Sequence, residues 1–152
     1  MSSESVVVRM GWIHWFVHRY LARRLEADGL TSRQFRFLSY LLRHDRVHQE
    51  QIAADLMVDR AVATRTIRDL IEAGYVVRER DPADRRAYLV TLTERGRATA
   101  PLIDEVVRNL NDALLAGLSN EEQATLISIL DRMVENVQRS ELPASCRCGR
   151  DA

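Results

Sequence analysis

The chain has 152 residues, with 22 basic and 22 acidic side chains and a formal net charge of zero. This length suits a single domain with its own core, and the absence of an apolar run of membrane-spanning length predicts a soluble, cytoplasmic protein. The sequence has no phosphate-binding glycine loop, no nucleophile motif and no lysine for a Schiff base, which argues against an enzyme and against a cofactor.

Two amphipathic helices are predicted at the N-terminal end. Apolar residues recur at helical spacing over residues 6–27, and Gly29 supplies the usual left-handed stop. Thr31 and Gln34 have the spacing of a capping box, which predicts the start of a second helix. We expect that helix to close near His44.

Two short helices separated by a tight turn are predicted next. The first runs over about residues 49–56, with His48 as a poor N-cap, and the second runs over residues 60–73, with Asp59 as its cap. Arg65 projects from the polar side of the second helix, where the small neighbouring residues permit a close approach to a surface. An arginine placed in this way can donate to guanine edges or to phosphates. The opposite, apolar side holds Ala63, Ile67, Leu70 and Ile71.

A charged hairpin follows these helices. Residues 75–80 and 87–92 are rich in β-branched and aromatic side chains, and the loop between them, DPADRR, carries a proline and two arginines. Helix, turn, helix and basic hairpin together predict a winged helix-turn-helix. The second helix suits the major groove of DNA, and the wing suits the neighbouring minor groove.

Two further helices are predicted after the hairpin. Thr93 caps a long helix that Pro101 should kink or begin afresh, and Ser119 with Glu122 starts the last helix, which ends near Arg139. The long helices carry more apolar surface than a small winged-helix core can bury, which predicts a dimer interface. Residues 140–152 have the composition of a disordered tail.

Charge divides unevenly along the chain although the total is zero. Residues 60–97 hold nine arginines against six acidic residues, a net charge of plus three, whereas residues 104–135 hold two arginines against seven acidic residues, a net charge of minus five. A basic reading head and an acidic helical part fit a DNA-binding protein with a separate assembly region.

Two segments resemble the MarR family of bacterial transcriptional regulators. DPADRRAYLVTLTERG is similar to the family's wing signature, and DRAVATRTIRDLIEAGYV is similar to its recognition helix. The resemblance covers about residues 6–139. It implies a mainly α fold with a small β-hairpin wing, in which six helices form a MarR-like dimer. The single domain would span residues 1–139, with dimerisation helices at about 6–27 and 94–139 and the winged helix-turn-helix at about 31–92.

The resemblance also implies a function and a set of DNA contacts. The protein would bind a palindromic operator on double-stranded DNA as a homodimer, most often to repress, and a small molecule would release it. Arg65 matches a base-contacting position, Arg86 an arginine inserted into the minor groove, and Asp84 the acid that pairs with Arg86. The residues expected at the DNA are Gln49, Gln51, Arg60, Ala61, Val62, Thr64, Arg65, Arg68, Asp84, Arg85 and Arg86.

The effector implied by the resemblance is a small aromatic or anionic molecule. Aromatic walls with one or two cationic groups would suit an aromatic acid. The side chains that could line such a crevice are Trp12, Trp15, His18, Arg19, Tyr40 and Arg43. Simple core or interface packing is the alternative reading of each of them.

Other functions remain open from the sequence. A winged helix can serve as a dimerisation or docking module without specific DNA binding, although the placement of the arginines argues against this. His14 and His18 have a spacing that can hold a metal, but no further ligands complete a site, so we expect none. Cys146 and Cys148 in the tail are the candidate thiol sensors of a redox-responsive regulator.

Overall fold

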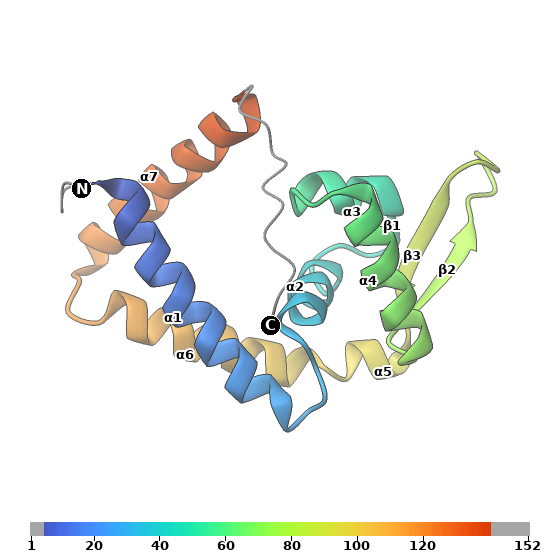
Figure 1. Ribbon diagram of the computed structural model, residues 1–152, viewed down its shortest axis with the longest axis horizontal. Coiled ribbons are helices and arrows are strands. Elements are labelled where there is room, and N and C mark those ends of the chain that lie inside the picture. The colour runs from blue at the N-terminus through green and yellow to red at the C-terminus, as the bar shows by residue number, and fades with distance from the viewer. Residues whose placement is uncertain (1–4, 141–152) are drawn as a thin grey trace. The chain divides into compact units, whose positions relative to one another are not determined.

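The computed structural model describes residues 5–140, and the chain divides into two compact units at Arg108 and Asn109. The first unit holds every strand, the first five helices and residues 100–108 of α6 (elements labelled in Figure 1). The elements are α1 (Val6–Glu26), α2 (Ser32–Leu41), β1 (Val47–His48), α3 (Gln49–Asp55), α4 (Arg60–Glu72), β2 (Val76–Arg80), β3 (Tyr88–Leu92), α5 (Glu94–Arg97), α6 (Ala100–Leu115) and α7 (Asn120–Arg139).

The first two helices end and begin as the sequence predicts. Gly29 adopts a left-handed φ of 66° after α1, and Thr31 and Gln34 form the complete capping box at the start of α2. The second helix is shorter than expected, because its helical hydrogen bonding ends at Leu41 and residues 42–44 form a turn. Arg24 joins α1 to α6 through both carboxylate oxygens of Glu105, at 3.2 Å each.

The core of the first unit lies among α2, α3, α4 and the sheet. It is built from side chains that are wholly removed from solvent, among them Phe37, Leu38, Ile52, Ile67, Leu70 and Val90. Thr66 is also buried, and its hydroxyl donates to the Val62 carbonyl oxygen at 2.8 Å, so the buried polar group is satisfied. Ile71 was expected on the apolar side of this helix, but it is 36% exposed, because the buried side is centred on Ala63, Thr66, Ile67 and Leu70 and Ile71 lies at its edge.

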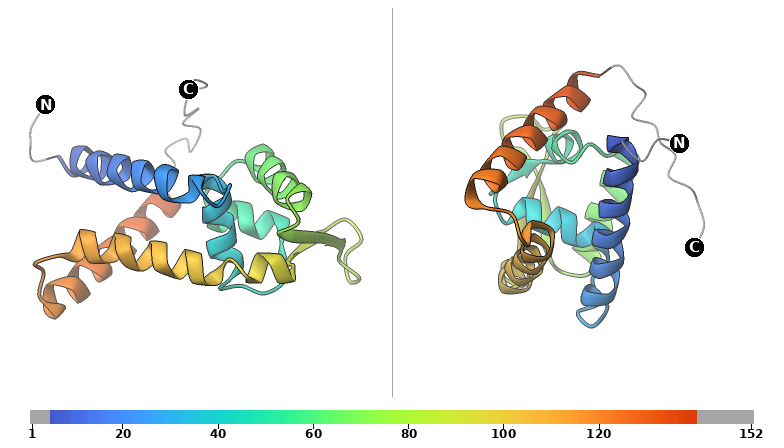
Figure 2. Two further views of the ribbon diagram at one scale, coloured as in Figure 1. Left: turned by 90° about the horizontal axis from the view of Figure 1, so that it is seen from below. Right: turned by 90° about the vertical axis from the view of Figure 1, so that its left-hand side faces the viewer.

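The sheet has three antiparallel strands in the order β1-β3-β2. The hairpin register pairs Arg80 with Tyr88 and Val76 with Leu92, and the hairpin projects past α4 as a wing (Figure 2). The strand β1 was not predicted, because two residues are too few for a periodic signal; it pairs Val47 with Val90 of β3. This pairing fixes the start of α3 against the base of the wing.

Two features of the helix-turn-helix cost local stability, and the first of them differs from the expectation. Asp59 occupies the N-cap position of α4, but its side chain makes no capping hydrogen bond. Met57, in the turn before it, has a positive φ of 49°, a conformation that costs an ordinary residue about 1–2 kcal/mol and that glycine adopts freely. The turn therefore stores a small strain.

The long helix expected after Thr93 is divided into α5 and α6. The break falls at residues 98–99, and Pro101 is the second residue of α6, as expected for a residue that starts a helix afresh. In the second unit, Ser119 and Glu122 form the predicted capping box of α7. No residue of α7 is buried. Among residues 5–140, no helix is long and apolar enough to cross a membrane.

The junction between the wing and α5 depends on Thr93 and Gly96. The Thr93 hydroxyl donates to the Gly74 carbonyl oxygen at 2.7 Å and accepts from the Gly96 N–H at 3.0 Å. A Cβ on Gly96 would collide with the carbonyl oxygen of Tyr75 and would lie 2.9 Å from a methyl carbon of Leu92. Only glycine fits here, for reasons of space.

We therefore predict that Gly96→Ala lowers the free energy of unfolding by about 1–3 kcal/mol or more, because backbone must shift to admit the methyl group. Urea denaturation measures this change. Gly11→Ala in α1 is the matched control, since a Cβ there meets nothing within 4 Å. Equal stability of Gly96→Ala and the wild type would contradict the close approach.

Candidate nucleic-acid interface

The exposed side of α4 carries three arginines with different partners. Arg60 lies 3.7 Å from a carboxylate oxygen of Glu50 on α3, and Arg68 lies 3.8 Å from Asp69 and 3.6 Å from Glu72. These pairs are exposed and therefore weak. Within the described residues, Arg65 between them has no hydrogen bond or ion pair.

The same side of α4 carries small side chains near its N-terminal end. Ala61 is exposed and Val62 is half-buried, and a shallow hollow is bordered by Arg60, Ala61, Thr64, Arg65 and Arg68. Five of the six expected contact positions on this helix thus border one surface. Small side chains and one unpaired guanidinium allow this surface to approach base edges closely.

Two glutamines of α3, both expected at the DNA, have different bonds. Gln49 donates from Nε2 to the Thr64 hydroxyl at 3.0 Å, and its Oε1 lies 3.5 Å from a guanidinium nitrogen of Arg78. Gln51 donates to Asp55 at 2.6 Å, within its own helix. Gln49 and Thr64 are therefore bonded to each other, and sequence spacing could not reveal this contact.

The tip of the wing is shaped by hydrogen bonds to backbone groups. Asp84 accepts the backbone N–H of Arg86 at 3.0 Å, and Asp81 accepts that of Ala83 at 2.8 Å. Asp84 was expected to pair with the Arg86 side chain. No such ion pair occurs among the described residues, and the Arg86 side chain is exposed. Asp84 instead contributes to the shape of the tip through its bond to the backbone.

Two arginines of β2 lie against the ring of Tyr88 on the neighbouring strand β3, and neither was predicted as a contact within the wing. The Arg78 guanidinium lies 4.5 Å from the centre of the Tyr88 ring and that of Arg80 lies 5.4 Å from it. Arg80 also donates to the carbonyl oxygen of Arg85 at 2.8 Å. The strand period of two, which places Arg78 and Arg80 on one face, was the signal that could have found them.

A histidine and an aspartate join the start of α3 to the wing. His48 Nε2 lies 2.7 Å from Asp81 Oδ2, which requires that Nε2 carry a proton. The hydrogen bond from His48, followed by that from the Ala83 N–H, holds the pKa of Asp81 below its ordinary value of 3.8. His48, a poor N-cap by its side chain, is used for this contact instead.

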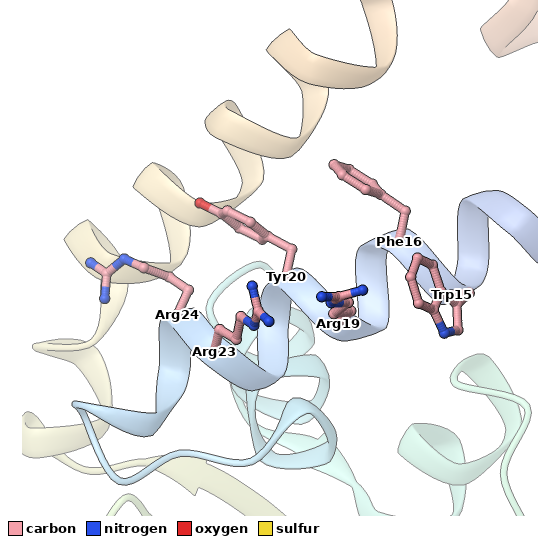
Figure 3. A pocket seen from close by; sticks show the side chains of 6 residues that line it. All are labelled: Trp15, Phe16, Arg19, Tyr20, Arg23 and Arg24. Carbon is pink, nitrogen blue, oxygen red and sulfur yellow. The ribbon is translucent and has the colours of Figure 1, made fainter.

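The six residues expected around an effector do not line one cavity in the described chain. Trp15 and Arg19 border a hollow with Phe16, Tyr20, Arg23 and Arg24. These side chains form two rows along α1 (Figure 3). One row holds Phe16, Tyr20 and Arg24, and the other holds Trp15, Arg19 and Arg23. His18 borders a different hollow, between α1, α2 and α4. Neither hollow contains Trp12, Tyr40 or Arg43 among its lining residues.

Tyr40 makes a contact of its own. Its hydroxyl donates to Asp55 at 2.6 Å and its ring stacks on His44 at 4.2 Å. Burial, and then the Asp55 hydrogen bond, raise the pKa of Tyr40 to about 12. The tyrosine thus links α2 to α3 in the described structure.

No group of three or more metal-ligating side chains occurs among residues 5–140. The ring centres of His14 and His18 lie 6.1 Å apart, and within the described part of the chain no third ligand completes a site with them. Cys146 and Cys148, the candidate thiol sensors, lie outside the described residues.

The contact between His48 and Asp81 makes a prediction about pH. A carboxylate whose folded pKa is lowered stabilises the folded state above its ordinary value of 3.8, and this stabilisation is lost as the pH falls through the lower folded value. We predict that Asp81→Asn lowers the urea midpoint at pH 7 and that the difference from the wild type shrinks below pH 3.8. Asp112→Asn, at an exposed site on α6, is the control. A difference that persists unchanged in acid would contradict the prediction.

Comparison with known proteins agrees with this architecture. The model of the MarR family matches residues 28–87. A protein of Thauera aromatica, which bears the provisional name of transcriptional regulatory protein for the hcr operon, is 31% identical over 141 residues, 92% of this chain and 82% of that protein.

Solved structures match over most of the chain. The crystal structure of a MarR transcriptional regulator from Methanosarcina mazei Go1 has a TM-score of 0.81 at 30% identity, covering 87% of this chain and 95% of that one. A protein of Listeria monocytogenes, solved in complex with a 26mer DNA, shares the fold with a TM-score of 0.85 at 23% identity, over 89% of this chain and 90% of that one.

These relatives are transcriptional regulators and none is named as an enzyme. The mainly α fold and the basic hairpin wing are those that the resemblance implied, and β1 adds a third strand to the hairpin. The chain belongs to the MarR family of winged-helix, DNA-binding transcriptional regulators.

Proposed function

We propose that this regulator binds a near-palindromic operator as a homodimer, represses from it, and is released by a small aromatic or anionic molecule. The observation that carries the DNA-binding part is the state of Arg65 and Arg86. Each is an exposed arginine on an element suited to a DNA groove, and neither side chain has a partner within the described residues. An unpaired guanidinium can bind DNA without first breaking an ion pair.

The roles of the DNA-facing residues follow from their chemistry. Arg65 would donate its two parallel N–H groups to a guanine, and Val62 would pack against a thymine methyl group. Arg60 and Arg68 would contact phosphates with a smaller gain in binding free energy, because each must first give up its pairing with a carboxylate. Arg86 would enter the minor groove from the wing tip and Arg85 would contact a phosphate. A protein that shares this fold has been solved in complex with a 26mer DNA, which supports DNA binding by the fold.

Exposed apolar side chains support the homodimer. In the first unit, α1 exposes Val7, Met10, Trp12, Ile13, Trp15 and Phe16, and in the second, α7 exposes Ile127, Ile129, Leu130, Val134 and Val137. A monomer rarely leaves this much apolar surface in water. Two-fold symmetry would place two recognition helices one helical turn of DNA apart, which is the reason to expect a near-palindrome.

The effector class is supported by one aromatic and cationic contact on α1. The Arg19 guanidinium lies 5.0 Å from the centre of the Trp15 ring, within the hollow shared with Tyr20 and Arg23. A planar acid could stack on the indole and pair with an arginine. Release from DNA would follow if the ligand favours a dimer whose recognition helices no longer fit the groove spacing.

We predict that an aromatic acid such as salicylate quenches tryptophan fluorescence and lowers operator affinity over the same concentration range. The matched test is Arg19→Ala, which should weaken both effects together. If a panel of aromatic acids changes neither signal, the small-molecule part of the proposal is contradicted, and regulation by another route, including oxidation of Cys146 and Cys148, becomes the alternative to test.

We predict that Arg86→Ala weakens operator binding at least tenfold, about 1.4 kcal/mol or more, because a minor-groove contact is lost. Fluorescence anisotropy with a duplex obtained by selection from random sequence measures this, and thermal unfolding should be unchanged. Arg33→Ala, on the exposed side of α2, is the matched control. Affinity near that of the wild type would contradict the wing assignment, and absence of any selected duplex would favour a docking module.

A further inference from the structure

Three consecutive residues at the start of α3 contact both DNA-facing elements. His48 bonds to Asp81 in the wing loop, and Glu50 lies 3.7 Å from Arg60 at the start of α4. Gln49, between them, reaches both sides at once, since it bonds to Thr64 of α4 and to Arg78 of β2. No other residue among those described makes side-chain hydrogen bonds to α4 and to the wing together.

The amide of Gln49 is used in one orientation only. Its nitrogen donates to the Thr64 oxygen at 3.0 Å, and its oxygen accepts from the Arg78 guanidinium at 3.5 Å. The reversed orientation would place an NH₂ group against a cation that can only donate. The arginine therefore fixes the amide, and the amide fixes the rotamer of Thr64.

From Arg78 the connection continues to the wing tip. The guanidinium lies against the Tyr88 ring, Tyr88 pairs across the hairpin with Arg80, and Arg80 donates to the carbonyl oxygen of Arg85. A continuous set of contacts thus runs from the recognition helix through Gln49 to the loop that holds Arg86. Coupling between sites is carried by contiguous contacts of this kind.

We propose that Gln49 is a positioning residue that fixes the wing relative to the recognition helix, so that both engage DNA as one rigid head. This role rests on the proposed function, and it differs from the DNA contact that the family resemblance implied for Gln49. Its amide acts through Thr64 and Arg78. Without it, each element would have to be ordered separately on binding, which costs affinity.

The test compares Gln49→Met, which keeps the length of the side chain, with Thr64→Val and with the double variant. Operator Kd should rise about tenfold in Gln49→Met, the effect of a lost hydrogen-bonded bridge. The double variant should bind the operator no more weakly than the weaker-binding of the two single variants, because Gln49→Met and Thr64→Val remove the same bridge. Effects that multiply would mean that Gln49 and Thr64 contact DNA independently, and would overturn the proposal.

A second readout needs no DNA. Amide hydrogen exchange across residues 76–92 should become faster in Gln49→Met, since the wing loses the Gln49 bond to Arg78. The pairing of β1 with β3 and the bond of His48 to Asp81 remain, so the hairpin itself should stay folded. Gln51→Met is the matched control, because its bond to Asp55 stays within α3 and it should leave wing exchange unchanged. If the wild type binds no duplex selectively, the proposed function fails, and faster wing exchange still supports the bridge whereas unchanged exchange overturns it.

Discussion

The position of every DNA-facing side chain on α4 depends on the burial of the opposite side of that helix. Ala63, Thr66, Ile67 and Leu70 are each no more than 1% exposed and lie at the spacing of a single helical face. Because they are fixed in the core, Arg65 and Arg68 must point outward. Slippage of the helix by one residue would rotate it by about 100° and bury an arginine, at a cost of several kcal/mol. Apolar packing therefore sets the geometry of a polar surface.

Electrostatics then divides the arginines by role. Arg60 and Arg68 have carboxylate partners, and Arg78 and Arg80 lie against an aromatic ring, so these four are occupied in the absence of DNA. Arg65 is not. Because the ion pairs of Arg60 and Arg68 are exposed and weak, these arginines can exchange them for phosphate contacts, which fix the orientation of a protein on DNA.

The sequence predicted the helices and the two helix starts that form capping boxes. Periodicity located the helices, and the spacing of Thr31 with Gln34 located a helix start. Pairs far apart in sequence carry no such signal, which is why the bonds of Gln49 to Arg78 and of His48 to Asp81 were missed. The family resemblance also differed from the structure at one residue: Asp84 was expected to pair with the Arg86 side chain, but it accepts the Arg86 backbone N–H. Local competition of this kind cannot be ranked without coordinates.

One measurement tests the central claim most directly, namely binding of the purified protein to a selected duplex and to a scrambled duplex at several salt concentrations. We expect one dimer per site, strong preference for the selected duplex, and a logarithm of affinity that falls linearly with the logarithm of salt concentration. Equal, weak binding to both duplexes with the same salt slope would contradict it, because that result requires only a basic patch and no reading of sequence.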